Sequence, residues 1–322
     1  MASENSRKTA GWLKGALGVL VLVALLYWVD FGAVVKCLGA ISLGDLGALF
    51  AISILLILVS VLKWRSFLER LGISASVSRL FRLYLLGYFV NLLMPSSLGG
   101  DLVRSVYVGK NVDKVRAVSA TLLERYTGFL AMVVMASFAI WWAPQITPAM
   151  RWATFALIII AVVSIVLLLS GKLEVLSRFL RIPERIHAKI VRLQDGMSWG
   201  LKDRDLLVRT GVLSILFHLL TVVNTAVVGY AVGWESIPWG DLLVVVPLIL
   251  LVGAIPISPQ GLGIQEGAFL FFLHSVGATS EQAVAVALTL RAKSYVLAAI
   301  GGFVWLGLRR EERANTLEDA AV

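Results

Sequence analysis

Cysteine and histidine are nearly absent from this chain of 322 residues. Cys37 is alone, which excludes an internal disulfide bond, and no grouping of cysteine and histidine has the spacing of a metal site. The three histidines, His187, His218 and His274, are scattered, and we expect them to be structural. The sequence therefore predicts neither a metal nor another cofactor.

Charged residues are also scarce, at 15% of the chain, whereas soluble globular proteins carry about 25%. Hydrophobic residues reach 59% and are grouped in long runs. These two deviations exclude a soluble domain. The net charge of +9 would suggest a nucleic-acid partner in a soluble protein, but lysine and arginine accumulate on the cytoplasmic side of membrane proteins. We therefore expect no nucleic acid.

Six apolar runs are long enough to cross a bilayer, which takes about 20 residues. They are Leu13–Val29, Leu46–Leu62, Ala117–Ala143, Trp152–Leu169, Leu206–Val232 and Ala283–Leu306. The first run lacks a small-x-small cleavage site after Val29, which favours a retained anchor over a signal peptide.

Basic residues predict how these runs are oriented. Arg7, Lys8 and Lys14 precede the first run, and Arg309, Arg310 and Arg313 follow the last, so both termini are predicted to be cytoplasmic. The bases that follow the second run, Lys63, Arg65, Arg70, Arg79 and Arg82, return the chain to the cytoplasm. On this interpretation only Lys36 and Arg151 of the 29 basic residues face outside. The protein is expected to be a multi-pass protein of the cell inner membrane.

Two further apolar segments are interrupted and are predicted to form re-entrant hairpins. Leu83–Gly100 is followed and preceded by bases, and its break contains Pro95, Ser96, Ser97, Gly99 and Gly100. Leu242–Ile255 and Ala268–Val276 have no base at their outer ends, and the break between them contains Pro256, Ser258, Pro259, Gln260, Gly261 and Gly263. Proline ends a helix and glycine permits a tight turn. Each hairpin should therefore enter and leave by one side, the first from the cytoplasm and the second from outside.

The two halves repeat one pattern in opposite orientation: span, span, broken hairpin, span. Asp101 follows the first break and Arg125 comes 24 residues later; Glu266 follows the second break and Arg291 comes 25 residues later. We predict an all-α polytopic membrane protein with about six full transmembrane helices and two re-entrant helical hairpins in an inverted-topology repeat, which is typical of transporters. The alternative is that the two breaks agree by chance.

The predicted organisation is a cytoplasmic tail (1–12), a first membrane repeat (13–143), a second membrane repeat (144–308) and a second cytoplasmic tail (309–322). Within the second repeat, residues from about 171 to 205 are polar, and Ile186, Ile190, Leu193 and Met197 share one helical face. This pattern favours an amphipathic helix on the cytoplasmic membrane surface, with a solvated connector as the alternative.

Charges inside spans are costly, so they line cavities or pair with one another. Glu124 and Arg125 lie about 12 Å into their span, and Arg291 and Lys293 lie at a similar depth from the opposite face. The candidate substrate-binding residues are these four and the polar residues near the breaks: Asn91, Ser96, Ser97, Asp101, Arg104, Ser258, Gln260 and Glu266. We expect Arg125 and Arg291 to hold a lipid phosphate. The alternative is that the charges only neutralise one another between the repeats.

Catalytic motifs are missing. Gly261–Gly267 does not have the spacing of a dinucleotide fingerprint, and Asp203-Arg204-Asp205 stands at a predicted helix start. The chain is therefore not expected to be an enzyme.

These motifs in this order resemble the lysylphosphatidylglycerol synthase transmembrane region family, also called the flippase-like domain. The resemblance is carried by Asn91, Pro95 through Asp101, Arg104, Leu123-Glu124-Arg125, Pro256 through Gly263, Glu266 and Arg291, and it covers about residues 10–308. It implies the flipping of a polar lipid across the inner membrane, with membrane lipids as partners. The sequence departs from members that carry an aminoacyltransferase domain, because it ends at Val322, and lysyl transfer is not expected.

Three functions remain open. The first is a lipid flippase or transporter for a polar, phosphate-bearing lipid or glycolipid. The second is a non-transporting membrane partner of a lipid-biosynthesis enzyme. The third is a membrane-embedded lipid transferase.

Overall fold

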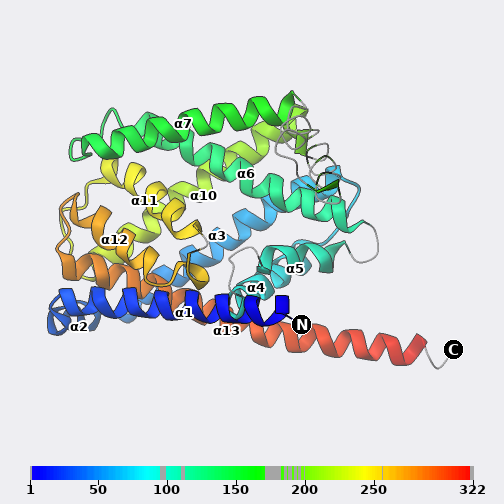
Figure 1. Ribbon diagram of the computed structural model, residues 1–322, viewed down its shortest axis with the longest axis horizontal. Helices are drawn as coiled ribbons and strands as arrows, with labels where there is room; N and C mark the ends of the chain where they lie inside the picture. The colour runs from blue at the N-terminus through cyan, green and yellow to red at the C-terminus, as the bar shows by residue number, and fades with distance from the viewer. Residues whose placement is uncertain are drawn as a thin grey trace.

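The computed structural model describes residues 2–94, 99–109, 113–170, 201–255 and 257–319, and single positions between 183 and 200. The side chains of residues 2–14 and 310–319 are not described. Every regular element in the described part of the chain is a helix (Figure 1).

The first half contains six helices among the described residues. They are α1 (Ala2–Trp28), α2 (Phe31–Gly39), α3 (Leu43–Arg70), α4 (Val77–Leu93), α5 (Gly99–Val108) and α6 (Lys114–Ala139). Short polar side chains start several of them by accepting a hydrogen bond from the free N–H groups of the first turn. Asp30, Ser42, Ser76 and Asp113 cap α2, α3, α4 and α6 in this way.

The described elements of the second half follow the same order. They are α7 (Pro148–Leu169), α10 (Arg204–Ala231), α11 (Trp239–Ala254), the short 3₁₀ helix η1 (Pro259–Gly261), α12 (Ile264–His274) and α13 (Ser280–Asp319). Thr147 caps α7, with Pro148 in its first turn, and Asp203 caps α10.

Five described helices are long and apolar enough to cross a membrane, and a sixth span arises if the bent pair formed by α1 and α2 is counted as one. The five are α3, α6, α7, α10 and α13. The predicted all-α polytopic membrane fold is confirmed. The first predicted run ends where expected, but α2 was not foreseen: the chain bends by 92° before Phe31 and continues as a separate nine-residue helix.

The helix contacts repeat between the halves. In the first half α4 packs on α5, α5 on α6, and α3 on both α4 and α6; in the second, α11 packs on α12, α12 on α13, and α10 on both α11 and α13. Across the halves, α4 packs on α13 as α11 packs on α6, and the equivalent helices α3 and α10 pack on each other. The hairpins α4–α5 and α11–α12 lie toward opposite ends of the molecule (Figure 1). This is the inverted-topology repeat.

The short helices after each break set its depth. α5 has 10 residues and α12 has 11, so each is about 15 Å long at 1.5 Å per residue. That length is half of a hydrocarbon layer about 30 Å thick. An arm of this length therefore reaches about half-way across such a layer.

Two glycines allow backbones to touch at the first hairpin and at the contact between the halves. A Cβ added at Gly100 would overlap the carbonyl oxygen of Gly87 on α4. A Cβ added at Gly301 on α13 would overlap the carbonyl oxygen of Leu85. Close helix contacts through small residues are typical of membrane proteins, where tight packing replaces a hydrophobic driving force.

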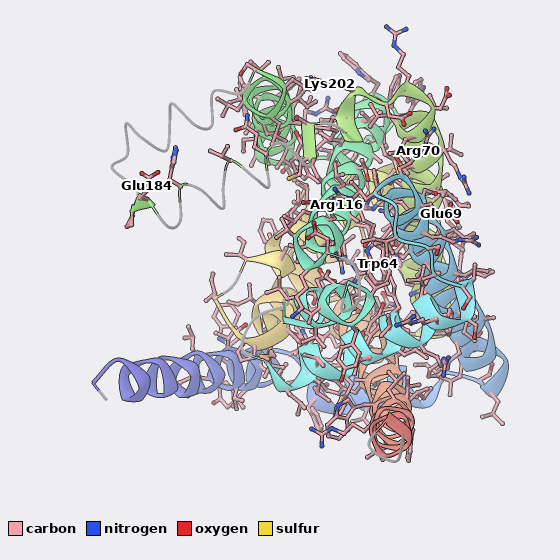
Figure 2. The ribbon with its side chains drawn as sticks, turned by 90° about the vertical axis from the view of Figure 1, so that its right-hand side faces the viewer. Trp64, Glu69, Arg70, Arg116, Glu184 and Lys202 are labelled. Carbon is pink, nitrogen blue, oxygen red and sulfur yellow. The ribbon has the colours of Figure 1, made fainter. Side chains whose placement is uncertain are left out.

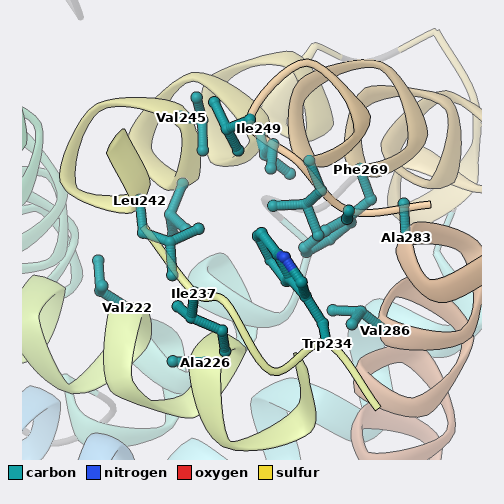
Figure 3. Packing of buried hydrophobic residues seen from close by; sticks show 14 of the residues in the cluster. Val222, Ala226, Trp234, Ile237, Leu242, Val245, Ile249, Phe269, Ala283 and Val286 are labelled. Carbon is teal, nitrogen blue, oxygen red and sulfur yellow. The ribbon is translucent and has the colours of Figure 1, made fainter. Parts of the chain in front are cut away.

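Buried apolar residues form two clusters. One joins α3, α4, α6 and neighbouring helices around Trp64, Phe67 and Leu86. The other joins α6, α10, α11, α12 and α13, and Trp234 lies in it between Ile237, Phe269 and Val286 (Figure 3). α7 is peripheral and packs mainly on α6.

The two ends of the molecule differ in composition. α1 begins and α13 ends at the same end (Figure 1), where Arg70, Arg116 and Lys202 surround the bundle (Figure 2). Exposed tryptophans gather in the loops and helix starts of the opposite end: Trp28, Trp141, Trp142, Trp152 and Trp239. Aromatic belts of this kind lie at membrane–water interfaces.

One sequence interpretation was wrong. Lys63 was assigned to the polar segment after the second span, but α3 continues to Arg70 and Lys63 is buried within it. On the apolar face of the predicted connector helix, Ile186, Ile190 and Leu193 lie outside the described residues, while Met197 packs against the cluster around Trp64.

Candidate functional site

Asp101 and Arg125 form a two-bond ion pair. Asp101 stands in the first turn of α5, directly after the first break, and Arg125 lies in the middle of α6. Nε of Arg125 donates to Oδ2 of Asp101 at 2.8 Å, and Nη2 donates to Oδ1 at 2.8 Å. The parallel bonds fix the guanidinium plane. The Arg125 side chain nevertheless remains 51% exposed, so part of its donor fork stays open.

Arg104 is held from four sides. Its guanidinium carbon lies 4.4 Å from the ring centroid of Trp64 and 4.0 Å from that of Tyr84. Nε donates to Oδ1 of Asp101 at 3.1 Å, and Nη2 donates to Oε2 of Glu124 at 2.6 Å. The side chain is 1% exposed, and aromatic faces attract cations, so its position is structurally fixed. Its Nη1 has no hydrogen-bond partner among the described residues.

Glu124 accepts two hydrogen bonds and faces a second cation. Besides Arg104, the hydroxyl of Tyr84 donates to Oε1 at 2.6 Å, and Nζ of Lys63 lies 3.9 Å from the same oxygen. We call Lys63, Asp101, Arg104, Glu124 and Arg125 the first charge cluster. With three cations and two carboxylates, its formal charge is +1.

Glu266 and Arg291 are the corresponding pair of the second half. Glu266 accepts from the backbone N–H of Gly263 at 2.7 Å and so caps α12 at the second break. Nε of Arg291 donates to Oε1 of Glu266. Its Nη1 and Nη2 donate to the carbonyl oxygens of Gln260 and Gly261 at 3.3 and 3.4 Å. Arg291 thus satisfies backbone groups that the broken helix leaves free, as a membrane interior requires.

Lys293 lies two residues beyond Arg291 on α13 and has no hydrogen bond or ion pair with any described residue. Together Glu266, Arg291 and Lys293 form the second charge cluster, also with a formal charge of +1. All three line a cavity of about 220 Å³.

The cavity lies mainly within the second half, at its contact with the first. Most of its wall comes from α10, α11, α12 and α13, while Leu56 and Tyr88 come from α3 and α4 of the first half. Phe217 of α10 separates it from the first charge cluster, because Nζ of Lys63 lies 5.7 Å from the centroid of that ring. The cavity therefore has positive charge on both sides, in surroundings where charge is weakly screened.

The remaining predicted residues hold the two breaks together. Oδ1 of Asn91 accepts from the N–H of Gly100 at 2.7 Å at the start of α5, where Gly99 is the first residue. Ser258 donates to the carbonyl oxygen of Leu262 at 2.7 Å, just after η1, which contains Pro259, Gln260 and Gly261. Pro95, Ser96, Ser97 and Pro256 lie outside the described residues.

Several site residues were missed from the sequence. Trp64 and Tyr84 sit in apolar runs and give no polar signal, and the interior position of Trp64 is visible in Figure 2. Asn224 is an isolated amide inside α10; it is buried, lines the cavity, and its Oδ1 has no hydrogen-bond partner among the described residues. Polarity inside a span was the available signal for Asn224.

The arrangement offers charged and polar groups that can bind a ligand. In the described part of the chain no three histidine, cysteine, aspartate or glutamate side chains are grouped to hold a metal ion. His218 bonds the carbonyl oxygen of Gly128 at 2.9 Å. The site offers cations, amides and hydroxyls around one cavity at mid-depth.

Residues 13–302 match the family described as the lysylphosphatidylglycerol synthase TM region. Two proteins of Methanothermobacter thermautotrophicus named UPF0104 membrane protein are each 24% identical to the chain; the matches cover 89% and 91% of it and 90% and 94% of the relatives. The UPF0104 membrane protein MJ1595 of Methanocaldococcus jannaschii is 20% identical, over 92% of this chain and 94% of its own. No solved structure matches.

Proposed function

Because the chain belongs to the lysylphosphatidylglycerol synthase TM region family, we propose that it is a flippase that moves a polar lipid or glycolipid across the membrane. The observation that carries this proposal is the cavity at the contact between the two inverted halves, with the second charge cluster in its wall and Lys63 of the first cluster behind Phe217. Inverted-repeat transporters bind substrate at this place, near the midplane and beside interrupted helices.

The difficulty in flipping a lipid is its headgroup, since burying an unpaired polar group in hydrocarbon costs several kcal/mol. Acyl chains can stay in the bilayer throughout. The cavity replaces water for the headgroup with side chains such as Asn224, Thr225, Gln265 and Lys293. Its volume of about 220 Å³ leaves room for a small polar headgroup.

We also propose that both chain ends face the cytoplasm of a cell whose inner membrane holds the protein. Bases are concentrated at the end where α13 ends, including Arg70, Arg79, Lys114 and Lys202, while Lys36 and Arg151 are at the end with α2. Lysine and arginine are retained on the cytoplasmic side. The first hairpin then opens to the cytoplasm and the second to the outside.

Purified full-length chain in liposomes tests the flippase proposal. Fluorescent lipids in both leaflets are bleached from outside by a membrane-impermeant reductant, and translocation increases the bleached fraction beyond one half. We expect this increase with the protein and not in protein-free liposomes or liposomes with an unrelated multi-pass protein. If every lipid headgroup tested gives the protein-free result, the chain is not a flippase for these lipids, and its role as a partner of a lipid-biosynthesis enzyme becomes the leading alternative.

A further inference from the structure

Resting on the flippase proposal, we propose that Lys293 and Asn224 select an anionic headgroup that carries free hydroxyls, of the phosphoglycerol class, against cationic aminoacylated headgroups. The step beyond membership of the family is the chemical class of the substrate and the residues that read it. Some polar groups at the cavity already have hydrogen-bond partners, and others have none among the described residues.

Arg291 is an unsuitable headgroup contact in this structure. Three of its five N–H donors bond Glu266 and the carbonyl oxygens of Gln260 and Gly261, and its side chain is 10% exposed. Releasing them for a substrate would strip the second break of its hydrogen bonds. Arg291 therefore positions the hairpin.

Lys293 is the opposite case. It lines the same cavity, yet no described carboxylate or carbonyl group bonds its ammonium. An unpaired charge at this depth costs free energy, and such residues mark substrate paths in membrane proteins. A phosphate or another acidic group in the cavity would supply the missing partner. A cationic headgroup would instead meet the second charge cluster, which has a formal charge of +1.

The cavity wall is also rich in acceptors. Asn224 is 3% exposed, and its Oδ1 is unpaired among the described residues. The hydroxyls of Thr221, Thr225 and Ser294 donate to backbone carbonyl groups of their own helices, so their oxygens keep lone pairs free. These acceptors need a hydrogen-bond donor, which the hydroxyls of a glycerol or sugar provide. A headgroup with one acidic group and neighbouring hydroxyls satisfies Lys293 and Asn224 together.

The test measures binding, independently of transport. Purified full-length chain is equilibrated in detergent with pairs of lipids that have the same acyl chains, and bound lipids are counted by native mass spectrometry. We expect phosphatidylglycerol to be preferred over phosphatidylcholine and over lysyl-phosphatidylglycerol. Lys293→Gln should reduce this preference about tenfold, whereas Lys293→Arg should keep it. Lys36→Gln, at an exposed lysine on α2, is the matched control and should bind as the parent does.

Asn224→Leu tests the hydroxyl part of the proposal. It should lower the preference for phosphatidylglycerol over phosphatidic acid, which lacks headgroup hydroxyls, and leave the preference over phosphatidylcholine intact. Thermal unfolding of each variant checks the fold, and Lys293→Gln should not lower the apparent Tm because it removes no described bond. Equal binding of all headgroups by the parent, or an unchanged preference in folded Lys293→Gln, overturns the inference. If the parent keeps its headgroup preference but translocates no lipid in liposomes, the flippase proposal alone is contradicted.

Discussion

At the scale of single residues, three arginines in this membrane core do three different tasks. Arg104 is clamped between Trp64 and Tyr84, Arg125 forms a forked pair with Asp101, and Arg291 ties down the backbone of a broken helix. Each needs a carboxylate, because a buried cation without a partner is strongly destabilising. The carboxylates are consequently as important to the fold as the arginines.

Glu124→Gln provides a measure of this dependence. The substitution removes the charge that faces Arg104 and Lys63 while keeping nearly the same shape. We expect a loss of about 3–5 kcal/mol of stability, the range for breaking a buried ion pair, seen as a large fall in apparent Tm. Glu69→Gln is the control, because its pair with Arg65 is surface-exposed and worth at most about 1 kcal/mol. Equal shifts in both variants would contradict the structural role of Glu124.

Arg125→Lys tests the remaining exposed fork. Lysine keeps the charge and can neutralise Asp101, but it cannot make two parallel bonds to that carboxylate or offer a planar donor surface. We expect the variant to fold, with a modest fall in Tm, and to translocate lipid at least about tenfold more slowly in liposomes. Arg116→Lys, at an exposed pair with Asp113, should match the parent in both measurements. Parental translocation by folded Arg125→Lys would show that the pair is only structural.

Much of the charged site was visible in the sequence because acids and arginines are rare inside spans. The spacing from Asp101 to Arg125 and from Glu266 to Arg291 indicated corresponding positions, and the structure places each acid against its arginine. Lys63 was misplaced because a base normally ends an apolar run. Its ammonium is kept inside α3 by Glu124 from another helix, which no local pattern reveals.

At the scale of elements, the first hairpin depends on the absence of a side chain where its helices meet. Gly100 of α5 faces the backbone of α4 at Gly87 and also donates its N–H to Asn91. The two helices can approach only as far as the smallest residue allows. The hairpin is thus set by backbone contact rather than by large side chains.

Gly100→Ala should separate the arms of the hairpin. Its new methyl group would overlap the Gly87 carbonyl oxygen, and overpacking of this kind costs about 1–3 kcal/mol. Gly87→Ala is a matched control across the same contact, because its nearest new neighbour would lie at 3.5 Å, an ordinary contact. We expect the apparent Tm to fall for Gly100→Ala and to stay within about 1 °C or rise for Gly87→Ala. The reverse order would mean that the helices do not touch here.

The helix ends were more predictable than the bends. Proline and glycine located both breaks, and most apolar runs began within a few residues of a helix start. α2 was missed although Asp30 is a recognisable N-cap, because the nine residues after it are too few to register as a span. Its 92° angle to α1 depends on packing against α13 and could not be read locally.

At the scale of the whole molecule, the inverted repeat predicts which loops lie on the same side of the membrane. Arg79 and Lys114 flank the first hairpin, and Glu235 and Thr279 flank the second; all four are exposed. Single cysteines at these positions, in a chain with Cys37→Ser, report sidedness through a membrane-impermeant thiol reagent. We expect the first two to react from one face and the last two from the other. Labelling of Arg79→Cys and Lys114→Cys from opposite faces would mean that the first hairpin crosses the membrane fully.

The half-length arms α5 and α12 have an electrical consequence. Because the breaks lie near mid-depth, a charge resting beside them has crossed about half of the membrane field, and a charge released at the far side has crossed all of it. Passage of one anionic headgroup is therefore a current, worth about 2.3 kcal/mol per 100 mV. In a cell with a negative interior, 100 mV alone would favour the outer leaflet by about fiftyfold at equilibrium, without nucleotide hydrolysis or a coupled ion. In liposomes, a potassium diffusion potential of reversed sign should reverse the preferred leaflet of the anionic lipid. The same potential should not change the distribution of a zwitterionic lipid carried by the same protein.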